Sequence, residues 1–393
     1  MSGIGPGPEA FIVGALRTPI GKRGGALSSL HPVTLLAQLL RGIVEQSGID
    51  PAQVDDVIGG CVTQCGAQGS NVTRNAWLAA GLPWDVPATT VDRQCGSAQQ
   101  AIHFAAQGIM SQQYDLVVAC GVESMSQVPL GANVRGPGEF PHGVWAEACG
   151  VEAISQFRAA QEIARRWDIS REEMDFRALD SHRKAARAID EGRFDREILP
   201  LKVTVADGAT TLVDRDEGVR RDTSVEKLAA LSPVEPESPD ITAGNSSQMS
   251  DGAAAVLLAS EEQARRLALT PRARITAMSV AACEPVVMLQ GPVPATRKLL
   301  QRTGMSIDDF DVLECNEAMG SIVPMWQKEF GIDWERINPN GSGISIGHPV
   351  GATGARMTVT LLHELERIGG RYGFQTMCEG GGQANAMVIE RLG

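Results

Sequence analysis

The 393-residue chain repeats one pattern of segments, and this repeat restricts the folds that it can adopt. A small-residue turn that opens a helix occurs at Cys95 and again at Thr353. A strand-like segment follows each turn, and the separation from Cys95 to Cys120 equals that from Thr353 to Cys378. Because similar segments at equal separations indicate an internal duplication, we expect two similar halves with an active site between them.

Around this repeat, strand-like and helix-like segments alternate, as is typical of a layered α/β sheet. The stretch 122–240 differs, because it is charged and carries amphipathic helix patterns at 155–167 and 171–190. We interpret it as an insertion that folds over the core. The sequence therefore predicts an N-terminal half at 1–121 and 241–270, a loop domain at 122–240 and a C-terminal half at 271–393.

Composition narrows the range of functions. The net charge of -12 argues against a nucleic-acid partner, which favours a basic surface. Apolar runs stay short of the ~18 residues that a membrane span needs, and residues 1–9 resemble a loose tail rather than a signal peptide. We expect the eight cysteines to be reduced in a cytoplasmic protein. Cys61 and Cys65 lack a second ligand pair at metal spacing, so we expect no metal site.

Cys95 is the first candidate for chemistry. A short extended stretch turns into a helix there, and the small residues 96–98 would let a carbonyl group approach the backbone. Unpaired N–H groups and the helix dipole at such a position favour the nucleophilic thiolate. A buried cysteine is more often a small hydrophobic residue, so the argument also needs the residues below.

Three further polar residues follow strand ends or Gly-rich loops. The loop 338–349 delivers His348, one of only six histidines, to a fixed place. Cys378 precedes Glu379 and three consecutive glycines, which weaken a chain unless a special backbone geometry requires them. Asn316 follows another strand-like segment, where its amide could hold a water or a carbonyl oxygen.

These segments together resemble the thiolase family, the acetyl-CoA acetyltransferases and 3-ketoacyl-CoA thiolases, over nearly the whole chain. The fold that this resemblance implies is a five-layer αβαβα sandwich of two similar halves, with an inserted loop domain that holds coenzyme A. The matching stretches are 17–22, the Cys95 segment, 121–126, 242–247, 316–318, 347–354 and 378–382.

The resemblance also implies roles for the candidate residues. Cys95 would be the acyl-accepting nucleophile, and Cys378 the acid/base for the α-carbon of acetyl-CoA. His348 would activate Cys95 and, with a water held by Asn316, would form one oxyanion hole. The backbone N–H groups of Cys95 and Gly380 would form the second.

Coenzyme A and acetyl-CoA would be substrates, with no permanently bound cofactor. The resemblance places Arg220, Arg221 and Thr223 at the nucleotide end of coenzyme A and Ser247 at its pantetheine arm. It also implies a homodimer or homotetramer that acts on acyl-CoA esters, without a nucleic-acid or membrane partner.

The resemblance implies a degradative role in fatty-acid β-oxidation as the leading hypothesis, and the chemistry of the residues agrees with the cleavage reaction. Cleavage of a 3-ketoacyl-CoA needs a nucleophile, an oxyanion contact and a proton donor for the departing enolate. One alternative is a biosynthetic acetoacetyl-CoA thiolase. Another is a non-catalytic acyl-CoA or sterol carrier, which the four intact residues disfavour. Cys378 disfavours a condensing synthase, in which histidine or asparagine usually stands there.

The chain departs from the usual family pattern near the acyl pocket. Met319 replaces the usual Phe, Ser342 replaces a Gly, and no Met-Gly element is found around 156–161. The segment after Cys378 is also more similar to thiolases of bacterial side-chain or steroid breakdown. We therefore expect medium-length or bulky 3-ketoacyl-CoA esters to be better substrates than acetoacetyl-CoA.

Overall fold

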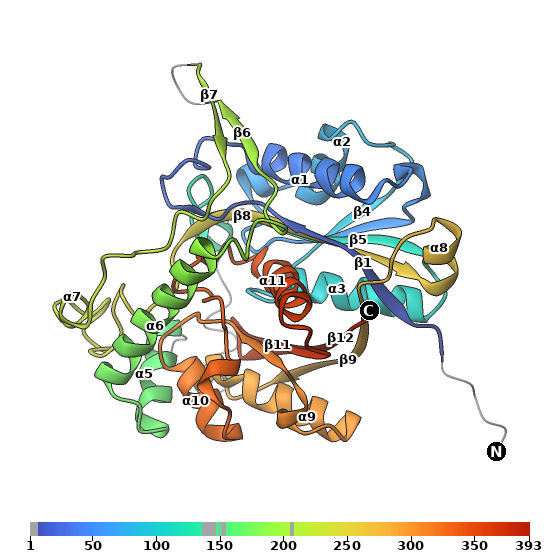
Figure 1. Ribbon diagram of the computed structural model, residues 1–393. Helices are drawn as coiled ribbons and strands as arrows, with labels where there is room; N and C mark the ends of the chain where they lie inside the picture. Colours follow the sequence, from blue (N-terminus) through green and yellow to red (C-terminus); the bar gives the residue numbers. More distant parts are fainter. Residues whose placement is uncertain (1–6, 136–146, 149, 151–154, 205–207) are drawn as a thin grey trace.

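The fold is built on a bent mixed sheet (Figure 1). The computed structural model describes residues 7–135, 147, 148, 150, 155–204 and 208–393. In this described part, ten strands pair in the order β10-β11-β12-β9-β1-β8-β5-β3-β4, with β2 alongside β8. They are β1 (Ala10–Arg17), β2 (Gly21–Lys22), β3 (Asp56–Gly60), β4 (Ala88–Val91), β5 (Leu116–Ser124), β8 (Ser250–Ser260), β9 (Ala273–Ala282), β10 (Val312–Cys315), β11 (Tyr372–Glu379) and β12 (Gln383–Arg391).

The two arms of this sheet have the same topology. In the order β1-β8-β5-β3 the first two pairings are antiparallel and the third is parallel, and the order β9-β12-β11-β10 shows the same series. The arms join where β1 pairs with β9 over two residues of each strand, Phe11 with Arg274 and Ile12 with Ala273. The predicted duplication into two similar halves is therefore confirmed.

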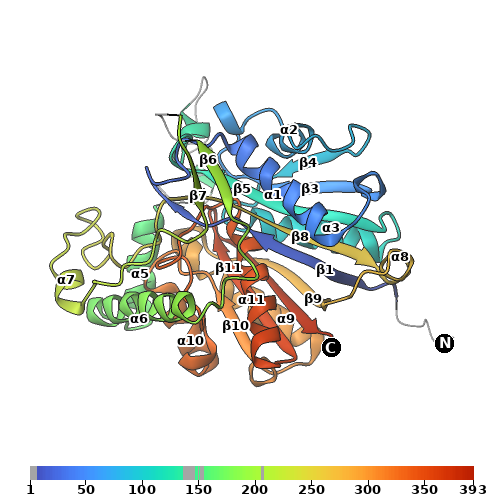
Figure 2. The ribbon, with the colours of Figure 1, turned by 45° about the horizontal axis from the view of Figure 1, so that its top comes forward.

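Helices complete five layers around the two arms (Figures 1 and 2). The central layer contains α3 (Ser97–Met110) and α11 (Thr353–Ile368), which lie between the arms. Thirteen of the residues of α11 are buried, because sheet or helix covers it on every side. The outer layers contain α1 (Pro32–Ser47) and α2 (Val72–Ala79) on one arm, and α9 (Pro292–Thr303) and α10 (Ile322–Phe330) on the other. The predicted αβαβα sandwich is confirmed.

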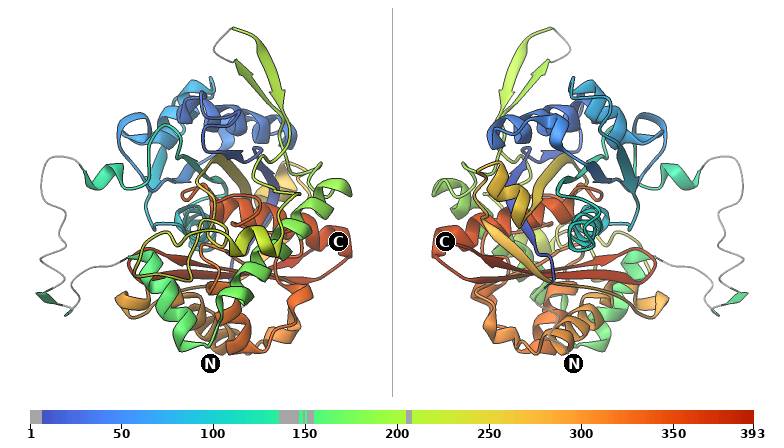
Figure 3. Two further views of the ribbon diagram at one scale, coloured as in Figure 1. Left: turned by 90° about the vertical axis from the view of Figure 1, so that its left-hand side faces the viewer. Right: turned by 90° about the vertical axis from the view of Figure 1, so that its right-hand side faces the viewer.

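The remaining elements lie around the sandwich. The predicted helices of the inserted stretch are present as α5 (Gln156–Arg166) and α6 (Arg171–Asp190), and the short α7 (Val225–Ala229) follows. A hairpin of β6 (Leu201–Thr204) and β7 (Thr210–Val213) extends away from the body (Figure 3). Smaller elements are α8 (Glu261–Arg266) and the 3-10 helices Pro51–Gln53, Gly66–Gln68, Ala132–Val134, Pro285–Gln290, Ile307–Asp309 and Trp334–Arg336. The domain limits stay predictions.

The first turns of α3 and α11 meet at the centre of the molecule. A Cβ on Gly354 would collide with the backbone of Gln99, and one on Gly60 would collide with the backbone of Ala98. Only glycine therefore allows this close approach. The carboxyl ends of the parallel strands β3, β5, β10 and β11 lead into the same region, which is where open α/β sheets bind ligands. No helix in the described part of the chain is long and apolar enough to span a membrane.

Candidate functional site

A cavity of about 1140 Å³ opens where the two halves meet. Cys95, His348 and Gly380 line it, as do Arg220, Arg221 and Ser247. The sequence placed these six residues in one site, and the structure brings them to one cavity. Its apolar lining includes Val62, Met125, Leu130, Phe157, Val234, Met288, Leu289, Met319 and Val350.

Cys95 lies in a tight turn just before α3. Ser97 holds this turn, because its hydroxyl accepts from the backbone N–H of Arg93 at 2.9 Å and donates to the carbonyl of Gln94 at 2.6 Å. Gln94 itself has a φ of +49°, a left-handed conformation that few non-glycine residues adopt. The backbone N–H groups of Cys95 and Gly380 lie close enough to the Cys95 sulfur to favour its ionised form and lower its pKa. The sulfur therefore lies beside the pair of donors that the sequence proposed as an oxyanion hole.

The preference for a thiolate that the helix start gives to Cys95 is outweighed in the folded protein. Burial raises the pKa of Cys95 to about 12, and the nearby carboxylates of Glu379 and Glu123 add to this rise. The two backbone N–H groups act in the opposite direction, but their effect is smaller than that of burial. Because desolvation penalises the charged form, Cys95 is a thiol at neutral pH and needs a base to become a nucleophile.

His348 is held so that one ring nitrogen keeps a lone pair and can act as that base. Its backbone N–H donates to the carbonyl of Gln248 and to the hydroxyl of Ser250, both at 3.2 Å. The Thr353 hydroxyl donates its single proton to the carbonyl of Pro349 at 2.9 Å and lies 2.7 Å from Nδ1 of His348. Nδ1 must therefore carry the proton, which leaves a lone pair on Nε2.

The imidazole is neutral in this environment. Burial lowers the pKa of His348 to about 3, and the Arg356 guanidinium contributes to the shift. Asn316 lies on the Nε2 side of the ring, where its amide nitrogen is 3.3 Å away. Its Oδ1 is buried and has no hydrogen-bond partner in the described part of the chain. Such an atom fits the predicted role of holding a water, since buried polar groups normally find partners.

Cys378 and Asn316 lie behind the cavity wall, and both are fully buried. Burial raises the pKa of Cys378 well above its usual value, and the charge of Cys95 is the next cause of this shift. The two thiols are therefore electrostatic neighbours, although Cys95 belongs to one half and Cys378 to the other. The structure thus pairs Cys95 with Cys378, and His348 with Asn316.

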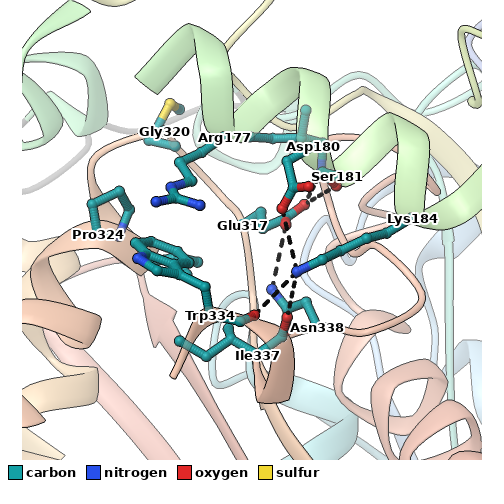
Figure 4. A pocket seen from close by; sticks show the side chains of 13 residues that line it. Arg177, Asp180, Ser181, Lys184, Glu317, Gly320, Pro324, Trp334, Ile337 and Asn338 are labelled. Carbon is teal, nitrogen blue, oxygen red and sulfur yellow. Dashed lines mark hydrogen bonds and ion pairs between the residues drawn. The ribbon is translucent and has the colours of Figure 1, made fainter. Parts of the chain in front are cut away.

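The segment 316–319, which includes Asn316 and the cavity residue Met319, contacts α6 through Glu317 (Figure 4). One carboxylate oxygen of Glu317 accepts from the Ser181 hydroxyl at 2.7 Å, and the other accepts from the Asn338 amide at 3.3 Å. Lys184 also donates to two backbone carbonyls of this region. On this side of the wall lies a second cavity of about 20 Å³, and Met319 borders both cavities. Hydrogen bonds from α6 and from Asn338 therefore hold this region in place on the side of the small cavity.

Of the four residues predicted to contact coenzyme A, three line the large cavity and one does not. Arg220, Arg221 and Ser247 line the large cavity, whereas Thr223 lines a neighbouring one of about 150 Å³ that shares Arg220. Arg221 also forms an ion pair with Asp190 at 2.8 Å. The sequence reasoning missed residues Lys22 and Arg23, which line the large cavity. The sequence feature that could have indicated them is the pair of adjacent cations at positions 22 and 23, where the matching stretch 17–22 ends.

Two further predictions concern sulfur and metal chemistry. The seven cysteines that the structure describes are free thiols, and Cys149 lies outside the described residues. Within the described ranges, no group of three or more His, Cys, Asp or Glu side chains has an arrangement that could hold a metal ion.

Comparisons with known proteins agree with this geometry. The family model for the thiolase N-terminal domain matches residues 10–262, and the model for the thiolase C-terminal domain matches residues 269–391. The chain belongs to the thiolase family. The family resemblance inferred from the motifs and the thiolase fold are therefore both confirmed.

Individual relatives of this thiolase cover almost its full length. A steroid 3-ketoacyl-CoA thiolase of Mycobacterium tuberculosis is 50% identical, over 98% of this chain and 94% of the relative. A beta-ketoadipyl-CoA thiolase of Pseudomonas aeruginosa is 42% identical, over 98% of this chain and 99% of the relative. The crystal structure of the Bacillus anthracis acetyl-CoA acetyltransferase is similar with a TM-score of 0.90 and 40% identity, and the match covers 98% of this chain and 99% of that one.

The hydrogen bond between Thr353 and His348 generates a testable prediction. In Thr353→Val the side chain keeps its shape but loses the acceptor for Nδ1–H, so the tautomer that exposes Nε2 is no longer selected. We expect kcat to fall at least about tenfold with a smaller change in KM, because Thr353 does not line the cavity. Thr353→Ser keeps the hydroxyl and should retain most of kcat. Equal activity of the Val and Ser variants in steady-state kinetics would contradict this role.

Proposed function

We propose that this chain is a degradative thiolase that cleaves a 3-ketoacyl-CoA with coenzyme A, yielding acetyl-CoA and a shortened acyl-CoA. The observation that carries the proposal is the pairing of two thiols from opposite halves, the half-buried Cys95 that lines the cavity and the buried Cys378, beside the Gly380 N–H. One thiol can hold the acyl group while the other exchanges a proton with the departing fragment. The family and the names of its relatives support an acyltransferase that acts on coenzyme A thioesters.

In the first half-reaction, Nε2 of His348 takes the proton of Cys95, and the thiolate attacks the ketone carbon. The N–H groups of Cys95 and Gly380 stabilise the resulting oxyanion. The bond between C2 and C3 then breaks, which leaves the acyl group on Cys95 and an enolate of acetyl-CoA. Protonated His348, with a water on Asn316, contacts the enolate oxygen, while Cys378 protonates its carbon and becomes a thiolate.

In the second half-reaction, Cys378 recovers its proton from the thiol of coenzyme A. The coenzyme A thiolate attacks the acyl-Cys95 thioester, and the same pair of N–H groups stabilises the oxyanion. Cys95 leaves as a thiolate and takes back the proton held by His348. The cycle is thus ping-pong, with every proton returned to its starting group.

The second part of the proposal concerns which acyl groups the cavity accepts. Met319 and Phe157 line the cavity together with Met288 and Leu289, where flexible methionines can adapt to an irregular ligand. We infer that branched, cyclic or medium-length 3-ketoacyl-CoA esters are preferred. The names of the steroid and beta-ketoadipyl relatives support this choice. The similarity to an acetyl-CoA acetyltransferase favours the second candidate, a biosynthetic acetoacetyl-CoA thiolase.

Trapping the acyl-enzyme tests the mechanism. Enzyme incubated with a 3-ketoacyl-CoA but without free coenzyme A should gain the acyl mass on the peptide that contains Cys95, because no second thiol is present to remove it. Peptide mass spectrometry locates the adduct, and addition of coenzyme A should release it. An adduct found only on Cys378 would reverse the two assigned roles.

A substrate panel separates the two candidate functions. We expect kcat/KM for thiolysis to rise from acetoacetyl-CoA to medium-length or cyclic esters, because each buried methylene contributes about 0.8 kcal/mol, or roughly fourfold. Met319→Phe, which restores the more usual residue, should shift this preference toward short chains. If the unmodified enzyme has its highest kcat/KM with acetoacetyl-CoA, this result would favour a biosynthetic acetoacetyl-CoA thiolase.

We further propose a cytoplasmic homodimer or homotetramer. The free thiols that the structure describes suit a reducing compartment. Support for self-association comes from β4, which ends the order of strands in the described sheet and leaves one edge unpaired. Trp84 lies nearby in sequence with 79% of its surface exposed, and Leu78 is 43% exposed.

Light scattering should therefore give a mass of two or four times the 41.7 kDa chain. Trp84→Glu should shift the assembly toward smaller species, because a charge opposes burial of this surface. Leu212→Glu, on the hairpin strand β7, offers a control at another exposed apolar residue. A monomeric unmodified chain would contradict the proposal.

A further inference from the structure

Lys22 and Arg23 line the large cavity, yet the mechanism above gives them no role. Both residues are exposed to solvent, and neither side chain forms an ion pair in the described part of the chain. Two adjacent cations at the edge of a substrate cavity are therefore available to a ligand.

The charge of the cavity is opposite to that of the whole chain, which has a net charge of -12. Among the described residues its lining contains four cations and two carboxylates, namely Lys22, Arg23, Arg220, Arg221, Glu217 and Asp222. Both carboxylates already have partners, because Glu217 accepts from the N–H of Ala26 at 3.0 Å and Asp222 pairs with Lys227 at 3.0 Å. Arg221 pairs with Asp190, which is outside the lining. An excess of cations in one cavity of an acidic protein favours an anionic ligand.

The segment 20–23 lies beside the segment 216–220, which carries Arg220. The N–H of Ile20 donates to Oδ1 of Asp216 at 2.8 Å, and the N–H of Glu217 donates to the carbonyl of Ile20 at 2.9 Å. Arg220 is three residues past Glu217, a span of at most about 11 Å. The cations of the N-terminal half and of the predicted loop domain therefore reach the same part of the cavity.

Backbone contacts hold the two cations in place. Lys22 pairs with Ser250 across β2 and β8, and the N–H of Arg23 donates to the carbonyl of Met249 at 3.1 Å. The hydroxyl of Ser250 also accepts from the N–H of His348. A ligand group bound by Lys22 and Arg23 is thus placed relative to the catalytic base by a single strand.

We propose that Lys22 and Arg23 form an anion-binding subsite for an oxyanion group of the substrate. A guanidinium can donate two parallel hydrogen bonds to phosphate or carboxylate oxygens, and an adjacent ammonium adds a point charge. The proposal rests on the proposed function, because that reaction supplies two such groups. One is a phosphate of coenzyme A, and the other is a carboxylate at the far end of the acyl chain.

Calorimetric binding of coenzyme A and of pantetheine, which has no phosphate, tests the first source. In the double variant Lys22→Gln, Arg23→Gln we expect about tenfold weaker binding of coenzyme A, or roughly threefold for each exposed cation. Pantetheine should bind as it does to the unmodified enzyme. Added salt should weaken the binding of coenzyme A more in the unmodified enzyme than in the double variant, because salt screens exposed charges.

A pair of 3-ketoacyl-CoA esters of equal length tests the second source. One ester ends in a carboxylate and the other in a methyl group. If the subsite takes the carboxylate, the double variant should lose roughly tenfold in kcat/KM for the first ester and little for the second, with calorimetric binding of coenzyme A unchanged.

Two further variants control for charge and for packing. Lys22→Arg keeps the charge and should stay near the unmodified enzyme in both arms. Lys298→Gln removes an exposed cation on α9, outside the cavity, and should change neither measurement. Circular dichroism confirms that each variant folds, as expected for exposed positions.

The proposal would be overturned if the double variant behaves as the unmodified enzyme in both arms. Equal losses for coenzyme A and pantetheine, or equal losses for the two esters, would also overturn it, because they would indicate a packing effect. The calorimetric arm needs no turnover. A chain that binds coenzyme A through Lys22 and Arg23 but cleaves no 3-ketoacyl-CoA would contradict the proposed function and leave the subsite supported.

Discussion

The site depends on the close contact between the two halves at the first turns of α3 and α11. Glycine at 354 allows the backbone of α11 to touch that of α3, which no larger residue would permit. The buried carboxylate of Glu123 joins the halves at the same level. It accepts from the N–H groups of Val62 and Gly351 at 2.9 and 3.0 Å, so it connects the N-terminal half with the loop that carries His348. Cys95 and His348 consequently share one cavity.

Burial at this contact determines the acid–base state of the whole site. The same desolvation that holds Cys95 and Cys378 as thiols makes His348 a neutral imidazole. A neutral base beside a neutral acid can exchange a proton without bringing a net charge into the protein. The arrangement therefore suits a reaction in which charge forms transiently on the substrate and is met by fixed N–H donors.

Much of this arrangement was predictable from local sequence. The equal separations from Cys95 to Cys120 and from Thr353 to Cys378 predicted the duplication, because both copies of a duplicated unit have the same number of residues between corresponding positions. The glycines after Cys378 indicated a special backbone, and Gly381 and Gly382 do have positive φ values of 77° and 80°. Lys22 and Arg23 were missed as cavity residues, because two adjacent cations do not by themselves show which distant loop they face.

The sequence by itself thus determined the family and the duplicated α/β layers, and it proposed Cys95, Asn316, His348 and Cys378 as candidates for catalysis, since motifs and periodicity are local properties. Only the tertiary structure decided the protonation states and the partners of these residues. A helix start alone favours a thiolate at Cys95, but desolvation in the folded protein and the nearby carboxylate of Glu379 reverse that preference. The hydroxyl of Thr353 likewise selects the tautomer of His348 only because the turn brings the two together. Desolvation and distance are properties of the packed molecule, and no segment carries them alone.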